Sequence, residues 1–173
     1  MNLYFLRHGI AVDPSAPDFA KDAERPLTAK GKRRLRQIAE AMGALKISFN
    51  LILSSPYVRA RQTAEIVAKI LKRKKRLKFS DELTPGGNPK SLVQQLNDLR
   101  PRPKNILLVG HEPYLGKLIA LLTAGNTNME IDLKKGSLCK LETESLRYAR
   151  CATLACLLAP RHLALMTGKR PAR

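Results

Sequence analysis

Two short, continuously apolar runs, residues 3–6 and 106–109, constrain the fold more than any other feature of this sequence. A strand that is apolar at every position, rather than at alternate positions, is typical of a parallel sheet covered on both faces. Weaker runs at residues 51–53 and 77–79 indicate further strands, and segments with helical spacing of apolar residues separate all four. This alternation predicts an α/β fold, a three-layer α/β/α sandwich with a mostly parallel central sheet.

The expected helices lie between these strands. Thr28 is a natural N-cap for a helix that runs to about residue 45, and Ser54-Ser55-Pro56 is a strong start for a helix that runs to about residue 71. The remaining expected elements are helices at 91–99 and 113–123 and two more strands at 137–143 and 149–158, for which a hairpin is one arrangement. At this length we expect one domain over residues 1–163, followed by a basic tail over 164–173.

The composition indicates a protein that attracts anions. Lys and Arg number 32 against 14 Asp and Glu, a net charge of +18. The most basic segments, residues 72–78 and the tail, have no interleaved aromatic residues for stacking on bases, so specific binding of nucleic acid is disfavoured. Three cysteines without a C-x-x-C pair favour reduced thiols, and no apolar run is long enough to span a membrane. We therefore expect a soluble, cytoplasmic protein.

Two of the three histidines directly follow the two clearest strands. Arg7-His8-Gly9 ends the first apolar run, and His111 comes two residues after the end of the second. Because ligands of open parallel sheets bind outside the carboxyl ends of the strands, we expect both imidazoles at one crevice.

Other polar side chains are expected at the same edge. Ser54, Ser55 and Arg59 follow the strand at 51–53, and Glu82 follows the strand at 77–79. One guanidinium group can donate two parallel hydrogen bonds to phosphate oxygens, and helix N-termini add positive potential. These residues predict a site for a phosphoryl group, whereas a metal site is disfavoured because the arginines would repel a cation.

Arg7-His8-Gly9 resembles the RHG signature of the histidine phosphatase superfamily, which includes phosphoglycerate mutases and acid phosphatases. The resemblance continues in order along the chain, at Arg25-Pro26-Leu27-Thr28 with Gly31, Ser54-Ser55-Pro56 with Arg59-Ala60, Gln62-Thr63-Ala64, Glu82-Leu83-Thr84-Pro85 and Val109-Gly110-His111. In its compact form the chain is similar to SixA-type phosphohistidine phosphatases from residue 1 to about 163. The resemblance implies a phosphoglycerate mutase-like fold without a lid subdomain, and no cofactor.

The resemblance also implies a role for each matching residue. His8 corresponds to a nucleophile that forms a covalent phosphohistidine, and Arg7, Arg59 and His111 correspond to groups that hold the phosphate oxygens. Ser54 and Ser55 are expected to contribute to substrate binding. Glu82 matches a position where many family members carry a general acid; orienting a water or a histidine is the alternative.

The substrate is less constrained by these motifs. Between Glu82 and His111 there is room for one short helix and little more, so we expect a shallow, open site that suits a phosphohistidine, or another phosphoramidate, on a protein surface. A broad phosphomonoesterase acting on small or nucleotide-derived phosphates is the alternative enzyme. A basic nucleic-acid-binding protein and a catalytically silent reader of phosphoproteins are two further alternatives.

Overall fold

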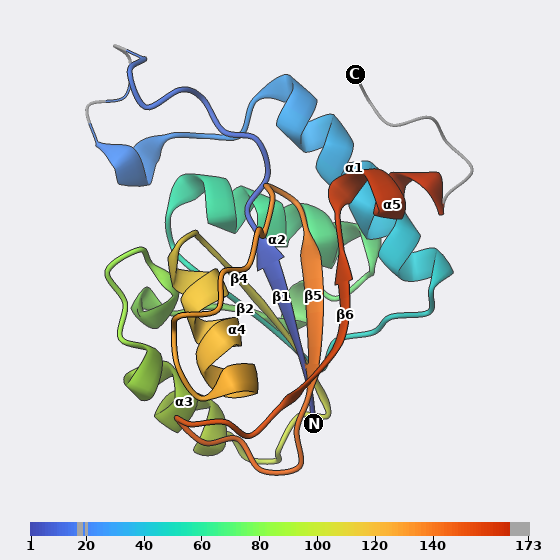
Figure 1. Cartoon of the computed structure of the whole chain (residues 1–173). Helices are drawn as coiled ribbons and strands as arrows, with labels where there is room; N and C mark the ends of the chain where they lie inside the picture. Colours follow the sequence, from blue (N-terminus) through green and yellow to red (C-terminus); the bar gives the residue numbers. More distant parts are fainter. Residues whose placement is uncertain (17–18, 20, 167–173) are drawn as a thin grey trace.

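The computed structural model of the chain describes residues 1–16, 19 and 21–166 and has a six-stranded sheet between two layers of helices (Figure 1). The strands are β1 (Asn2–Arg7), β2 (Leu51–Ser54), β3 (Leu77–Phe79), β4 (Asn105–Gly110), β5 (Leu138–Glu142) and β6 (Thr153–Leu158). The α-helices are α1 (Ala29–Ala44), α2 (Val58–Ile70), α3 (Pro89–Asn97), α4 (Tyr114–Ala124) and α5 (Pro160–Leu165). Three short 3-10 helices are η1 (Asp22–Glu24), η2 (Lys74–Arg76) and η3 (Asp81–Leu83).

The strand order is β3-β2-β4-β1-β5-β6. The first four strands of the chain pair in parallel, and β5 and β6 form an antiparallel hairpin at one edge. The expected three-layer sandwich with a mostly parallel sheet is therefore confirmed. Because β1, β2 and β4 lie side by side, the loops that follow them meet at one edge of the sheet.

Two apolar cores explain why the central strands are apolar at every position. On β1, Leu3 and Phe5 face one core, which α3 and α4 cover. Tyr4 and Leu6 face the other core, which α1, α2 and α5 cover (Figure 1). Successive side chains of a strand point to opposite faces, so a strand buried on both faces has no position for a polar residue.

Some predicted boundaries differ from the structure. Helix α2 begins at Val58 rather than at the Ser54-Ser55-Pro56 segment, and the Ser55 hydroxyl accepts a hydrogen bond from Tyr57 N in the turn before it. The two serines therefore shape the turn instead of capping the helix. Strand β6 begins at Thr153 rather than at residue 149.

The C-terminal end of the described chain is the short helix α5. The expected boundary between domain and tail, after residue 163, falls inside this helix, where Ala164 is buried. Residues 167–173 of the expected tail lie outside the described residues. In the part of the chain that is described, no helix has the length and apolar character needed to cross a bilayer.

Two glycines of α1 give a matched test of how tightly this helix packs against the loop after β1. A Cβ at Gly31 would lie 2.1 Å from the Ile10 carbonyl oxygen, whereas a Cβ at Gly43 would lie 3.5 Å from a Leu71 methyl group. We expect Gly31→Ala to lower the free energy of unfolding by about 2 kcal/mol or more, and Gly43→Ala to raise it by about 0.5 kcal/mol because alanine favours helix. Urea unfolding measures both, and a Gly31→Ala variant as stable as the wild type would contradict the packing.

Candidate active site

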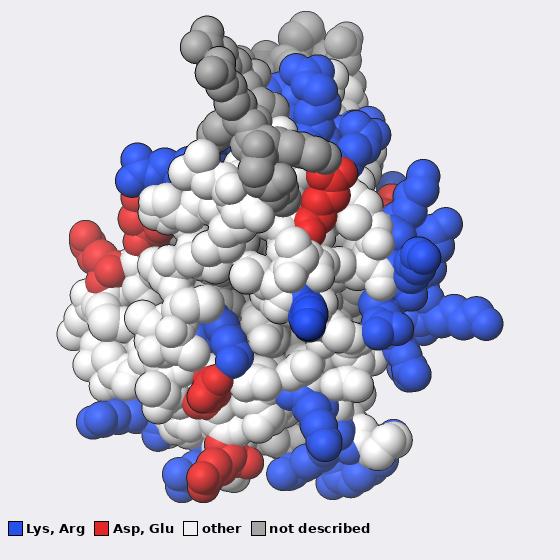
Figure 2. Space-filling view, turned by 90° about the vertical axis from the view of Figure 1, so that its right-hand side faces the viewer, with Lys and Arg blue, Asp and Glu red and all other residues white. Residues whose placement is uncertain are grey.

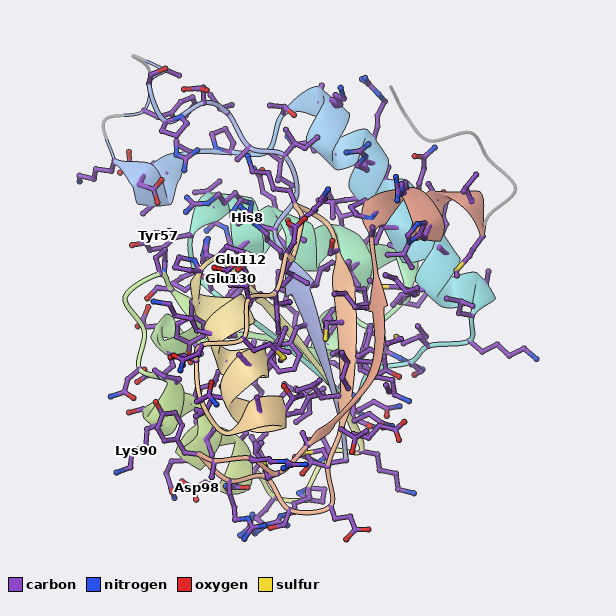
Figure 3. The ribbon with its side chains drawn as sticks, in the orientation of Figure 1. His8, Tyr57, Lys90, Asp98, Glu112 and Glu130 are labelled. Atoms are coloured by element: carbon purple, nitrogen blue, oxygen red, sulfur yellow. The ribbon has the colours of Figure 1, made fainter. Side chains whose placement is uncertain are left out.

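Side chains from three elements meet at the carboxyl ends of the parallel strands. His8 follows β1, Arg59 lies in the first turn of α2, and His111 follows β4. The centroids of the two imidazole rings are 5.1 Å apart, and Arg59 Nε lies 3.2 Å from His8 Nε2. Figure 3 shows His8 and Tyr57 at this end of the molecule and Lys90, on α3, at the other.

The hydrogen bonds of His8 define which ring nitrogen carries the proton. His8 Nδ1 lies 2.8 Å from the Gly9 carbonyl oxygen. Because a carbonyl oxygen only accepts, Nδ1 must be the protonated nitrogen. Nε2 is then unprotonated, and its lone pair accepts the hydrogen bond from Arg59 Nε. This tautomer leaves Nε2 as the nitrogen that can attack an electrophile.

Both imidazoles are held in the neutral form. Burial is the largest cause that lowers the pKa of His8 to about 3, and Arg59, Arg7 and Lys135 lower it further while the bond to the Gly9 carbonyl opposes them. Burial also lowers the pKa of His111 to about 3, with contributions from His8 and the two arginines. A neutral imidazole at neutral pH is the form required of a nucleophile.

His111 is oriented by the turn between β2 and α2. Its Nε2 lies 2.9 Å from the Ser55 hydroxyl, which already accepts a hydrogen bond from Tyr57 N and can donate its own proton to the ring. The Tyr57 ring packs against His111 with centroids 5.2 Å apart. On this assignment the second ring nitrogen, Nδ1, carries a proton, and this nitrogen is buried without a hydrogen-bond partner.

Arg7 presents a second unpartnered donor. Its Nη1 donates to the Leu133 carbonyl oxygen at 2.9 Å, while its Nε is buried and makes no hydrogen bond. Buried polar atoms are rarely left without partners, and such an atom calls for an explanation. Two unpartnered N–H groups near a neutral imidazole, in a strongly basic surrounding, fit the oxygens of a tetrahedral anion.

Arg59 is bound to an acidic residue that sequence reasoning did not identify. Its Nη2 lies 2.8 Å from Asp22 Oδ2, and its Nη1 donates to the Asp22 carbonyl oxygen at 2.6 Å. Arg25 also bonds the Asp22 carboxylate. Burial raises the pKa of Asp22, but the hydrogen bonds from Arg25 and Arg59 outweigh it, so the pKa is lowered and the carboxylate stays ionised. In the sequence Asp22 lies in a polar loop, and nothing in that loop indicates a contact with Arg59.

Two expected site residues make local hydrogen bonds. The Ser54 hydroxyl donates to the Ser55 carbonyl oxygen and so serves the turn. The Glu82 carboxylate accepts a hydrogen bond from Asn88 N at 2.8 Å, which holds it within its own loop. The structure therefore brings together Arg7, His8, Arg59, His111 and Ser55, while the Ser54 hydroxyl and one Glu82 carboxylate oxygen make local hydrogen bonds, and the roles expected of these two residues stay predictions.

The site is more enclosed than the sequence suggested. His8, Arg59 and His111 are exposed by only 6%, 4% and 1%. The expectation of a shallow, open site did not account for Asp22, which lies over Arg59, or for Tyr57, which packs against His111. Among the described residues there is no group of three or more His, Cys, Asp or Glu side chains that could hold a metal ion.

Comparisons with known proteins agree with this geometry. The model of the histidine phosphatase superfamily (branch 1) matches residues 3–84. Phosphohistidine phosphatase SixA of Escherichia coli (strain K12) is 34% identical over 128 residues, which are 73% of this chain and 77% of that protein. An uncharacterized protein of Picosynechococcus sp. is 38% identical over 148 residues, 85% of this chain and 88% of that protein.

Solved structures share the fold. The structure of the protein histidine phosphatase SixA complexed with tungstate superimposes with a TM-score of 0.77 at 27% identity, covering 92% of this chain and 97% of that one. The expected phosphoglycerate mutase-like fold is thereby confirmed.

The lowered pKa values of the two histidines predict a pH dependence of stability. Between about pH 6.5 and pH 3 the unfolded chain protonates both histidines and the folded chain does not, so the free energy of unfolding falls as pH decreases, by up to about 1.4 kcal/mol per pH unit for each group. Urea unfolding across this range measures the slope. We expect His111→Asn to reduce this slope by the contribution of one group, about 1.4 kcal/mol per pH unit. An unaltered slope in His111→Asn would be inconsistent with a neutral, buried ring.

The contact between Asp22 and Arg59 predicts how a free anion binds. The carboxylate occupies part of the guanidinium and repels an incoming anion, so Asp22→Asn should bind inorganic phosphate about 3- to 10-fold more tightly in a calorimetric titration. Glu24→Gln removes the same charge from the same 3-10 helix, where Glu24 pairs with the exposed Lys21, and serves as the control. Equal tightening in both variants would show that only net charge matters.

Proposed function

This chain belongs to the histidine phosphatase superfamily and is a phosphatase of the SixA type, and we propose that its substrate is a phosphohistidine side chain of another protein. The observation that carries the proposal is the combination of a neutral His8, whose Nε2 is unprotonated, with the engagement of Asp22, Glu82 and Glu112 in hydrogen bonds of their own. The first feature suits covalent catalysis. The second suits a leaving group that needs no general acid.

Of the carboxyl groups in the loops around this edge, which also include Glu130 (Figure 3) and Asp132, Asp22, Glu82 and Glu112 are each engaged in a hydrogen bond. Asp22 is ionised between two arginines, and Glu82 bonds Asn88 N. Glu112 accepts a hydrogen bond from Gly116 N at 3.0 Å and so caps the first turn of α4, although burial raises its pKa. An alkoxide leaving from a phosphate ester needs a proton, whereas an imidazole that is protonated on its other nitrogen leaves as a neutral molecule. The site therefore favours cleavage of a P–N bond.

The proposed reaction has two displacements at phosphorus. His8 Nε2 attacks the phosphorus atom in line, and the P–N bond to the substrate histidine breaks with its electron pair going to the leaving imidazole nitrogen. His8 gives up the hydrogen bond from Arg59 in this step, and Arg59 turns to the phosphoryl oxygens. Arg7 Nε and His111 Nδ1 are the free donors that take the other oxygens. Water then attacks the phosphorylated His8, releasing phosphate and restoring the neutral ring.

The relatives support this choice of substrate. The Escherichia coli relative is a phosphohistidine phosphatase, and the SixA structure holds tungstate, a tetrahedral oxyanion of the same shape as phosphate. We also propose that the protein is cytoplasmic. Its three described cysteines are free, which is typical of a reducing compartment. The phosphohistidine proteins on which it acts would have to be in the same compartment.

The proposal is tested by replacing two histidines and comparing two substrates. We expect wild-type protein to release phosphate from a phosphohistidine peptide far faster than from p-nitrophenyl phosphate. His8→Ala should lower kcat/KM for the peptide by about a thousandfold or more, because no other group can form the covalent intermediate. His162→Ala, at an exposed residue outside the site, should stay within about twofold of the wild type.

Two results would separate the parts of the proposal. Undiminished hydrolysis by His8→Ala would remove the nucleophile assignment. Faster turnover of the ester than of the phosphohistidine peptide, lost in His8→Ala, would keep the nucleophile but replace the substrate with a phosphomonoester.

A further inference from the structure

A second basic feature adjoins the candidate active site on the side of Arg7. A hollow of about 450 Å³ opens there, and five of the residues that line it are cationic: Arg7, Arg34, Lys134, Lys135 and Arg161. None of the described residues that line it is Asp or Glu. Arg7 belongs to both places, since its guanidinium also flanks His8. A group bound in the hollow would therefore lie next to a phosphoryl group on His8.

The backbone fixes two of these cations beside Arg7. Gly136 N donates to the Arg7 carbonyl oxygen and Arg7 N donates to the Ser137 carbonyl oxygen, so the chain before β5 is bound to the end of β1. Ser137 N also donates to the Lys134 carbonyl oxygen, closing a tight turn. Gly136 has a φ of 86°, and a Cβ there would lie 2.9 Å from an Ile38 methyl group, so the turn requires glycine. The turn holds Lys134 and Lys135 at the rim.

The other side of the hollow comes from two helices that pack on each other. Arg34 lies on α1, and Arg161 lies in the first turn of α5. Leu163 of α5 and Leu35 of α1 are buried in the same core. The hollow is thus built from four segments that are distant in sequence and rigidly joined.

The cations of this hollow have only weak or distant acidic neighbours: Asp13 lies near Lys135, and Glu112 and Asp132 lie near Arg7. Lys134 lies 3.5 Å from Asp132, with both side chains largely exposed, and such pairs contribute little. Arg34, Lys135 and Arg161 form no ion pair with any described residue. Lys135 is also close enough to His8 to contribute to the low pKa of that ring, which agrees with the hollow adjoining the site. Unpaired cations gathered in one place attract an anionic partner.

We propose that this hollow is a docking subsite for acidic side chains that flank the phosphohistidine of the protein substrate. The inference rests on the proposed function and names the surface that such a substrate presents. Lys134, Lys135 and Arg161 are exposed on long, mobile side chains, which suits a broad contact with carboxylates better than the close fit that a small bisphosphate requires. The phosphoryl group would accept hydrogen bonds from the buried donors of Arg7 and His111. The acidic side chains would bind the cations at the rim of the hollow.

Positive charge also lies elsewhere on the molecule, so a test must separate the hollow from the net charge. On the face drawn in Figure 2, Lys and Arg gather along the right-hand and lower edges and Asp and Glu are sparse. A second basic hollow is lined by residues 69 and 72–76, just before the amino end of β3 and so away from the site. Lys74 and Lys75 in that hollow provide a matched control.

The experiment uses two synthetic phosphohistidine peptides of equal length, one with Glu and one with Gln on both sides of the phosphohistidine. We expect wild-type protein at low ionic strength to have a kcat/KM about tenfold higher for the Glu peptide, mainly through a lower KM. The double variant Arg34→Glu/Arg161→Glu should lose this preference and keep its activity on the Gln peptide within about twofold, because neither residue contacts His8. The control Lys74→Glu/Lys75→Glu makes the same charge change and should keep the preference.

Each contrary result has a distinct meaning. Equal hydrolysis of both peptides by the wild type would leave the proposed function standing and overturn the docking subsite. So would an equal loss of preference in the two double variants, since the effect would then come from net charge alone. A wild type that hydrolyses neither peptide would overturn the proposed function, and the subsite with it.

Discussion

One hydrogen bond, from His8 Nδ1 to the Gly9 carbonyl oxygen, determines what the candidate site can do. It commits the proton to Nδ1 and leaves the lone pair on Nε2, which faces Arg59. The backbone around it is fixed from two sides. Thr63 accepts a hydrogen bond from Gly9 N, and a Cβ on Gly9 would lie 2.6 Å from a Leu35 methyl group. The tautomer of His8 is therefore a property of the packed fold rather than of a mobile side chain.

Around this ring the fold maintains an excess of hydrogen-bond donors over acceptors. Burial and the neighbouring guanidiniums keep both imidazoles neutral, so positive charge resides on the arginines. Asp22 pairs with Arg59 and Arg25, and the N–H groups at Arg7 Nε and His111 Nδ1 stay unpartnered. A phosphoryl group supplies the missing acceptors and negative charge together. Part of the positive charge of this strongly basic chain therefore serves to bind a phosphoryl group at one edge of the sheet.

Much of this arrangement could be predicted from the sequence, because it follows from periodicity and topology. The continuous apolar runs predicted the parallel strands. Because ligands bind at the carboxyl ends of such strands, the sequence also predicted that Arg7, His8 and His111 lie at one edge of the sheet. Contacts made by loops were beyond such reasoning. The pairing of Asp22 with Arg59 depends on the path of the loop before α1, and the Glu82 carboxylate turns to Asn88 N because of its local turn. The enclosure of the site depends on the same loop contacts.

The protonation state of His8 is the most direct test of the whole account. With only three histidines in the chain, long-range ¹H–¹⁵N correlation spectra of ¹⁵N-labelled protein at neutral pH resolve each ring, and His8→Ala assigns the signal. The account predicts a neutral His8 with a proton on Nδ1 and none on Nε2, unchanged on moderate acidification. A doubly protonated ring, or a neutral ring with its proton on Nε2, would contradict it, because Nε2 would then have no lone pair to attack phosphorus.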